Sequence, residues 1–144
     1  PEGEIVEVTR DQAQWGYRHS MMADAGYVVV EATLELSPDE QVEIQARMDD
    51  FHARRVEKQP LEMPSAGSTF KRPEGYFAGK LIQDAGLRGY KVGGAQVSEK
   101  HTGFVVNAGG ATAADVRQLI ADVQARVKEE FGVELEPEVK MWGF

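Results

Sequence analysis

Residues 91–127, KVGGAQVSEKHTGFVVNAGGATAADVRQLIADVQARV, decide the fold class of this chain. Lys91 to Ser98 and Gly103 to Val106 are rich in strand-forming residues and flank a polar connection, so we expect two strands. Thr112 then caps a helix, with Asp115 three residues later as a short-armed capping box. The helix has one apolar face at helical spacing, formed by Val116, Leu119, Ile120, Val123 and Val127. This stretch predicts a sheet packed against one face of a helix.

The segment on the N-terminal side predicts a second long helix. Ser37-Pro38-Asp39-Glu40 places an N-cap residue, a proline and two acids in the order that starts a helix, which we expect to reach about Glu57. Before it, Tyr27 to Leu36 and the shorter Glu4 to Thr9 have the β-branched content and alternation of strands. The expected inner face of the helix consists of Val42, Ile44, Met48 and Phe51 or His52.

The remaining segments complete an α+β pattern. Gln59 to Gly75, rich in proline, serine and glycine, predicts an ordered loop or short extended pieces, and Tyr76 to Ala85 predicts a short helix. Gly93-Gly94 indicates a bulge or a close backbone approach. Val133 to Trp142 reads as a last strand, interrupted at Pro137 and therefore at an edge or a bulge. Because strands and helices do not alternate strictly, we expect an α+β fold with a small mixed or antiparallel sheet packed against two long helices.

The composition excludes several function classes. The chain has 144 residues, a formal net charge of −8 and a pI near 4.9, so a sequence-independent grip on nucleic acid is not expected. It contains no cysteine, which excludes disulfides and thiolate catalysis and fits a reducing compartment. No apolar run approaches the length of about 18 residues that a membrane helix needs, and we expect neither a membrane span nor a signal peptide.

Two short stretches hold the residues best suited to proton chemistry. Pro64 to Pro73 places the hydroxyl of Ser68 next to a glycine and near the cation Lys71. Leu135 to Lys140 places Glu138 directly after a proline. Taken alone, a turn hydroxyl and a surface carboxylate are the simpler interpretations. A serine and a glutamate on rigid backbone can also form a proton-handling pair.

Other catalytic patterns are weaker. Ser68 to Lys71 matches the S-x-x-K pattern of serine acylases, in which both side chains share one helical face. Pro73 disfavours a helix there, and an S-D-N element is absent, so we reject this interpretation. The three histidines are scattered without helical spacing, so we expect no metal site. The glycine pairs at 93–94 and 109–110 lack the strand, loop and helix order of a phosphate cradle.

Six ordered motifs along the chain favour the proton-handling interpretation of Ser68 and Glu138. In this order they closely resemble the MurB family, the UDP-N-acetylenolpyruvoylglucosamine reductases, which are flavoenzymes of peptidoglycan precursor synthesis. The resemblance runs from about Glu4 to Gly143. The motifs are Tyr17–Ser20, Gly67–Pro73, Phe77–Ile82, Ala85–Gly89, Gly93–Asn107 and Leu135–Val139.

The resemblance covers only the C-terminal half of the family pattern. The glycine-rich flavin-contacting segment of the family has no counterpart here. We therefore expect residues 1–36 to be the remnant of an FAD-binding domain and residues 37–144 to be the substrate-binding domain. A cut chain also fits the start at Pro1 without methionine. The short connection from Pro73 to Tyr76 is similar to the compact form of the family, which lacks an extra loop.

The resemblance implies a mechanism and a set of site residues. NADPH reduces FAD, and the enolpyruvyl group of the sugar nucleotide then accepts a hydride and a proton. By similarity, Ser68 donates the proton, while Arg18 and Glu138 stabilise the enolic intermediate and Arg18 also contacts the cofactor. A guanidinium suits a carboxylate that gains charge, and a serine hydroxyl needs a polarising neighbour such as Lys71.

The substrate contacts implied by the family are Lys58, Arg72 and His101. Lys58 lies where the family has a basic residue for the diphosphate. The expected partners are UDP-N-acetylglucosamine enolpyruvate and NADPH, in a cytoplasmic monomer, while the chain alone could self-associate and is expected to be inactive. The alternative function is a free-standing UDP-sugar binding module without redox activity.

Overall fold

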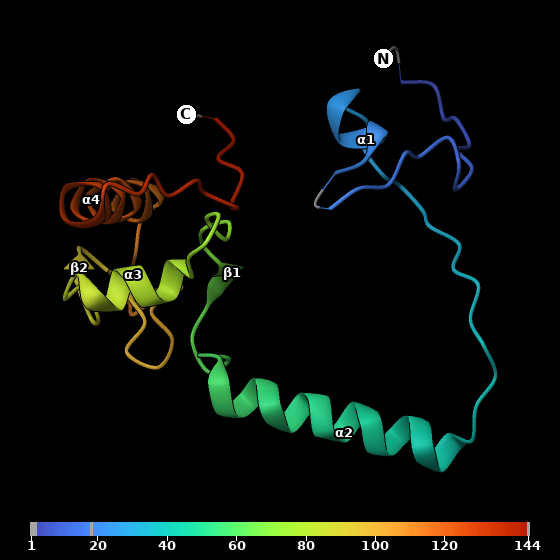
Figure 1. The fold of residues 1–144 in the computed structure, drawn as a ribbon, viewed down its shortest axis with the longest axis horizontal. Helices are drawn as coiled ribbons and strands as arrows, with labels where there is room; N and C mark the ends of the chain where they lie inside the picture. Colours follow the sequence, from blue (N-terminus) through green and yellow to red (C-terminus); the bar gives the residue numbers. More distant parts are fainter. Residues whose placement is uncertain (1–2, 18, 144) are drawn as a thin grey trace. The chain divides into compact units, whose positions relative to one another are not determined.

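The computed structural model describes residues 3–17 and 19–143, and they fall into two compact units, Pro1–Asp39 and Glu40–Phe144 (Figure 1). The second unit contains the sheet and most of the helices. The predicted functional boundary, a flavin-domain remnant through Leu36 followed by a substrate domain, remains a prediction. None of the helices in the described part of the chain has the length and apolar character that a bilayer crossing requires.

The sheet has four antiparallel strands in the order β1-β4-β3-β2. Their bounds are Ser65–Ser68 (β1), Lys91–Val92 (β2), Ala95–Val97 (β3) and Phe104–Asn107 (β4). Together with the helices that accompany it, this sheet confirms the predicted α+β class.

The glycine pair at 93–94 forms the turn of a hairpin instead of a bulge within one strand. Val92 and Ala95 are paired directly across it. A Cβ added at Gly94 would lie 2.3 Å from the carbonyl oxygen of Gly109, so only glycine allows the two backbones to approach so closely. Of the two sequence interpretations, the close backbone approach is confirmed and the bulge is wrong.

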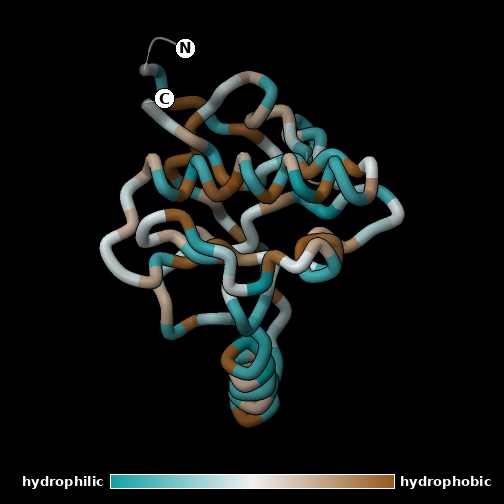
Figure 2. The backbone as a smooth tube through the Cα atoms, turned by 90° about the vertical axis from the view of Figure 1, so that its left-hand side faces the viewer, coloured by the Kyte–Doolittle hydropathy of each residue, from teal (hydrophilic) through white to brown (hydrophobic). Residues whose placement is uncertain are grey.

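Two helices of the second unit supply much of its core. α3 spans Ala78–Asp84 and α4 spans Ala113–Phe131. Thr112 and Asp115 form the predicted capping box, and Gly132, with φ of 68°, ends α4 in the left-handed conformation. Figure 2 shows the alternation of apolar and polar residues along α4. The buried core of the unit includes Ile82, Val97, Leu119, Ile120, Val123 and Val127.

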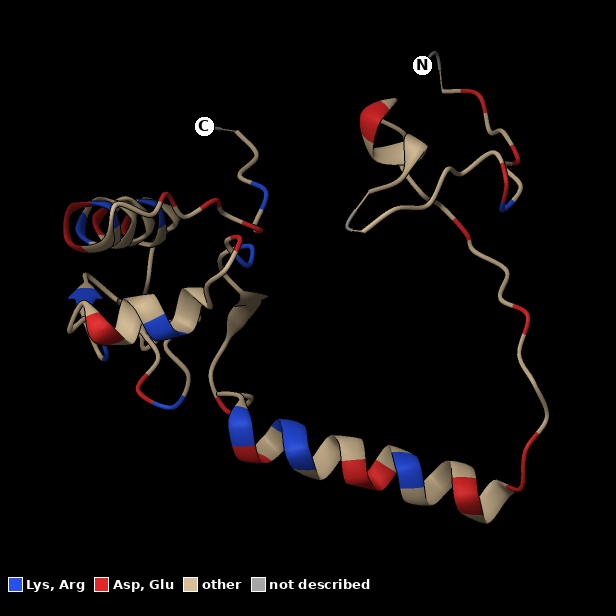
Figure 3. Cartoon of the chain, viewed as in Figure 1, with Lys and Arg blue, Asp and Glu red and all other residues tan. Residues whose placement is uncertain are grey.

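The first long helix, α2, spans Gln41–Lys58. It begins after Glu40 and not at Ser37, and it ends one residue from the predicted position. None of its residues is buried, so the predicted inner face is wrong for this chain: Val42 is 78% exposed and Met48 is 60% exposed. Opposite charges follow one another along it (Figure 3), and pairs such as Arg54 with Asp50 at 2.7 Å support the helix locally.

Three segments predicted as strands lack ladder partners among the described residues. Tyr27 to Leu36 and Glu4 to Thr9 form no sheet pairing, and the first unit contains one short helix, α1, at Met21–Asp24. Val133 to Trp142 contributes one isolated bridge, between Pro137 and Phe70. A strand pattern in the sequence describes side chains, whereas a strand in the structure also needs a neighbouring backbone.

Candidate active site

Ser68 is the last residue of β1, and a bulge controls its presentation. Ser65 pairs with Val106 and Ser68 pairs with Phe104, so β1 carries one more residue than β4 between these pairs. Gly67 has φ of 89°, a conformation that other residues rarely adopt, and its missing Cβ would meet no neighbour. Ser68 itself is exposed. The glycine that precedes it is therefore required by backbone conformation.

The Glu138 segment lies beside the residues that follow Ser68. Phe70 forms an antiparallel bridge with Pro137. The backbone N–H of Glu138 donates a 2.8 Å hydrogen bond to the carbonyl oxygen of Thr69. Glu138 is exposed, like Ser68. The two segments that the sequence suggested as a proton-handling pair are thus joined through their backbones.

Of the two cations expected near Ser68, Lys71 is described by the structure and Arg18 is not. Lys71 donates its backbone N–H to the carbonyl oxygen of Glu136 at 2.8 Å, and its ammonium group also pairs with the carboxylate of the same residue. The Lys71 side chain is therefore engaged by Glu136, although the sequence suggested it as the polarising neighbour of Ser68. Arg18 lies outside the described residues, and its predicted roles stay predictions.

Lys58 is the exposed last residue of α2. Lys100, in the loop between β3 and β4, contacts the C-terminal end of α2: its ammonium group donates to the carbonyl oxygen of Val56 at 2.6 Å and lies 3.7 Å from the Glu62 carboxylate. A cation at this position satisfies a C-terminal helix carbonyl. Lys100 thus holds the end of α2, which carries Lys58, next to the loop that contains His101.

Arg72 lies just beyond the bridge of Phe70 with Pro137. Its Nε donates to the carbonyl oxygen of Tyr76 at 3.3 Å, and its guanidinium lies 4.0 Å from the centre of the Phe77 ring. Stacking on a ring fixes the guanidinium plane while the side chain stays exposed. This arrangement suits a cation that meets an anionic ligand at the surface.

His101 is half-buried in the loop between β3 and β4. Its Nδ1 accepts a 3.1 Å hydrogen bond from the backbone N–H of Gly103, so a neutral ring carries its proton on Nε2. The ring also meets the edge of Phe104 with 5.0 Å between centroids. The adjacent Thr102 hydroxyl donates to the carbonyl oxygen of Gly79 at 2.5 Å. His101 therefore helps to build the loop in which it sits.

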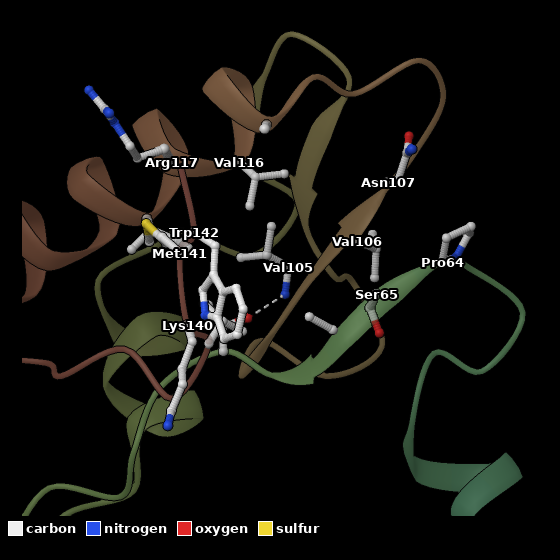
Figure 4. Close-up of a pocket in the computed structure, with 15 residues that line it drawn as sticks. Pro64, Ser65, Val105, Val106, Asn107, Val116, Arg117, Lys140, Met141 and Trp142 are labelled. Carbon is white, nitrogen blue, oxygen red and sulfur yellow. Dashed lines mark hydrogen bonds between the residues drawn. The ribbon is translucent and has the colours of Figure 1, made fainter. Parts of the chain in front are cut away.

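A cavity of about 510 Å³ lies next to this junction, between β1, β4, α4 and the C-terminal segment (Figure 4). The predicted residues Ser68, Glu138, Lys58, Arg72 and His101 do not line it. Its apolar wall includes Val105, Val116, Ile120, Val139, Met141 and Trp142.

Thr69 is the residue at this site that the sequence reasoning missed. It is 3% exposed, lies between Ser68 and Phe70, and also lines the cavity. Its hydroxyl accepts a 2.9 Å hydrogen bond from the backbone N–H of Val105, drawn as a dashed line in Figure 4. In the sequence it is only a β-branched residue in a motif, because its partner is set by the tertiary register of β1 and β4.

The family model described as "UDP-N-acetylenolpyruvoylglucosamine reductase, C-terminal domain" matches residues 59–142. The chain belongs to this family. The match includes Ser68, Arg72, His101 and Glu138, whereas Lys58 lies one residue before it. The family resemblance carried by the six sequence motifs is confirmed.

Relatives of known name extend this likeness over nearly the whole chain. A UDP-N-acetylenolpyruvoylglucosamine reductase from Agathobacter rectalis is 64% identical over 142 residues, which are 99% of this chain and 45% of the relative. One from Clostridium perfringens is 60% identical over 139 residues, 96% of this chain and 46% of the relative. The chain therefore spans about half the length of the curated relatives it matches.

A solved structure shares the fold. The crystal structure of the UDP-N-acetylenolpyruvylglucosamine reductase (MurB) from Thermus caldophilus matches with a TM-score of 0.71 and 38% sequence identity. The match covers 91% of this chain and 47% of that chain.

Proposed function

We propose that this chain forms the substrate-binding half of a UDP-N-acetylenolpyruvoylglucosamine reductase and supplies the residues that deliver the proton. The reaction reduces the enolpyruvyl group of the sugar nucleotide to a lactyl group. The observation that best supports this role is the 2.8 Å backbone hydrogen bond from Glu138 to Thr69, which holds the Glu138 segment next to Ser68. The relatives that carry this reductase name are 64% and 60% identical to the chain.

In this proposal each of three residues acts on one developing enolate. Ser68 gives its hydroxyl proton to the carbon next to the substrate carboxylate. Glu138 donates a hydrogen bond to the carboxylate as charge builds up there, which requires it to be protonated at that moment. Arg18 offers a two-pronged donor to the same group. Lys71, whose ammonium group pairs with Glu136, is not assigned the role of polarising the Ser68 hydroxyl.

Three further side chains would bind the substrate. Lys58 and Arg72 are exposed cations suited to the diphosphate, and the Arg72 guanidinium is already ordered on the Phe77 ring at 4.0 Å. His101 presents its Nε2 side while Nδ1 holds the Gly103 backbone. A nucleoside diphosphate sugar offers oxygens to all three.

Gly94 and the N-terminus of α4 do not offer a cradle for the phosphates of a flavin dinucleotide. Space at Gly94 is filled by the backbone of Gly109, and the N-terminus of α4 is closed by the capping box of Thr112 and Asp115. The part of the reductase outside this chain would therefore supply most contacts to FAD and NADPH, with the predicted contact of Arg18 added to them, in the cytoplasm as the family resemblance implies.

The decisive experiment uses the complete reductase that carries this segment. Enzyme reduced with NADPH is mixed without oxygen with UDP-N-acetylglucosamine enolpyruvate, and flavin absorbance and the lactyl product are followed. Ser68→Ala should slow this step about 100-fold to 10,000-fold, the usual worth of general acid catalysis, and leave reduction by NADPH unaffected. Ser65→Ala, an exposed serine of the same strand whose hydroxyl accepts a long, 3.4 Å hydrogen bond from the N–H of Gly67, is the matched control and should react nearly like the wild type. An unchanged rate in Ser68→Ala contradicts the proton-donor assignment.

A second measurement separates the redox enzyme from a binding module. If the complete protein binds UDP-N-acetylglucosamine but neither contains a flavin nor consumes NADPH, the reductase proposal fails and the UDP-sugar module remains.

A further inference from the structure

Thr69 connects the two strands and the segment that carry the proposed proton chemistry. Its backbone N–H donates to the carbonyl oxygen of Gly103 at 2.9 Å, and its own carbonyl oxygen accepts from Glu138 at 2.8 Å. Its hydroxyl accepts from the N–H of Val105 at 2.9 Å. With 3% of its surface exposed, it lies inside the junction and not on it. Three separate segments therefore meet at this one residue.

The Thr69 hydroxyl forms its hydrogen bond beside the bulge in β1. In a regular antiparallel ladder, the N–H of a strand residue donates to a backbone carbonyl of its neighbour. The extra residue between Ser65 and Ser68 breaks that sequence of bonds. The N–H of Val105 then donates to a side chain, the hydroxyl of Thr69. This side-chain acceptor adds a contact between the bulged end of β1 and β4 that does not depend on the backbone ladder.

Resting on the function proposed above, we infer that Thr69 is a positioning residue for that reaction. Its hydroxyl fixes the bulge that presents Ser68, and its carbonyl fixes the backbone of Glu138. Both proposed catalytic side chains thus take their positions from one buried residue. Thr69 does not touch the substrate; it sets the distance and direction from which Ser68 and Glu138 reach it.

Valine tests this role because it has nearly the shape of threonine and lacks the acceptor. In Thr69→Val the buried N–H of Val105 loses its hydroxyl acceptor, which is unfavourable away from water. The bulged end of β1 is then held less firmly against β4, and Ser68 and Glu138 shift with it. A displacement of about 1 Å can lower a rate about 100-fold, so we expect kcat to fall between about 10-fold and 100-fold.

The experiment again uses the complete reductase and compares Thr69→Val, Thr69→Ser and Thr102→Val. Thr69→Val should slow oxidation of the reduced enzyme by the enolpyruvyl sugar nucleotide, while its reduction by NADPH and the KM for the sugar nucleotide change by less than about threefold. Thr69→Ser retains the acceptor and should restore most of the rate. Thr102→Val removes another buried threonine hydroxyl, bonded to Gly79, and should leave kcat within about twofold of wild type. Amide hydrogen exchange should become faster at Val105 and Glu138 in Thr69→Val alone.

Each outcome decides a different claim. A slow sugar-nucleotide step in Thr69→Val, rescued in Thr69→Ser and absent in Thr102→Val, supports the positioning role. If Thr69→Val reacts at the wild-type rate, or if both half-reactions slow equally, Thr69 is only a structural residue and the inference is overturned. Ser68→Ala, measured alongside, separates this from the proposed function. If Ser68→Ala reduces the sugar nucleotide slowly and Thr69→Val does so at the wild-type rate, only the inference about Thr69 fails. If Ser68→Ala reacts at the wild-type rate, the proton-donor assignment on which the inference rests fails as well.

Discussion

The backbone N–H of Glu138 donates a 2.8 Å hydrogen bond to the carbonyl oxygen of Thr69. This hydrogen bond lies next to the bridge of Phe70 with Pro137. Pro137 has no N–H to donate, and it is tolerated there because the residues on either side of the bridge make the backbone hydrogen bonds. The junction therefore depends on main-chain groups and on the proline between two glutamates. It follows that changing the exposed side chains on either segment should leave the junction intact, and that their effects on rate report on chemistry.

Glu138→Gln is the direct test of the carboxylate. We expect kcat for reduction of the sugar nucleotide to fall about 100-fold to 1000-fold, the usual cost of one lost donor to a developing oxyanion. The unfolding temperature should not change, because the bond to Thr69 uses the backbone. Glu136→Gln, on the same segment, is the control and should retain the wild-type rate. Equal rates in the two variants would remove Glu138 from the proposed site.

Lys71→Met separates two roles for that cation. The ammonium pairs with Glu136 at the surface, where the side chains are 41% and 69% exposed. Exposed pairs contribute about 0.2–1 kcal/mol and are screened by salt, so chemical denaturation should show a small loss that shrinks as salt is added. We expect the rate of sugar-nucleotide reduction to stay well above that of Ser68→Ala. A loss as large as in Ser68→Ala would show that Lys71 polarises the serine after all.

The extent to which sequence predicted this structure depends on what each signal describes. The capping box of Thr112 and Asp115 is a local signal, and the structure reproduces it. Tyr27 to Leu36 has strong strand character, yet it stays unpaired among the described residues, since pairing requires a backbone that the segment cannot supply. Thr69 was missed because its hydroxyl acquires its partner, the backbone N–H of Val105, only through the tertiary register of β1 and β4.

The site residues also divide into those that local sequence motifs predicted and those whose contacts depend on tertiary pairing. Ser68 and Glu138 were placed by motif, and the structure brings their segments together through Thr69. The partner of Lys71 could not be predicted, because it is set by the pairing of two segments from opposite parts of the chain.

Asp115 should make the stability of the second unit depend on pH. The backbone N–H of Thr112 donates a 2.9 Å hydrogen bond to the Asp115 carboxylate, and this bond, with the interaction of the carboxylate with the Thr112 side chain, lowers the pKa of Asp115. A carboxyl whose pKa is lowered by folding stabilises the fold above its usual pKa, and this contribution is lost as the pH falls through that value toward the lowered one.

The measurement compares wild type with Asp115→Asn by chemical denaturation across the acid range. The difference in unfolding free energy should be largest near neutral pH and should shrink as Asp115 becomes protonated. Glu129→Gln, an exposed acid on the same helix, controls for a general change of charge. A difference that does not vary with pH would mean that the charge of Asp115 does not contribute to the cap.

The same substitution, valine to alanine, made once on α4 and once on α2, tests whether the apolar side chains of α2 are packed in this chain. Val123 of α4 is 0% exposed and Val42 of α2 is 78% exposed. Both substitutions to alanine raise helix propensity in the same direction, so the difference between them reports burial. Val123→Ala should lower the unfolding free energy by about 1.5–3 kcal/mol, whereas Val42→Ala should stay within about 0.5 kcal/mol of wild type in urea denaturation of this chain. A large loss in Val42→Ala would instead restore the inner face of α2 that its sequence predicted, and with it a packing partner for that helix.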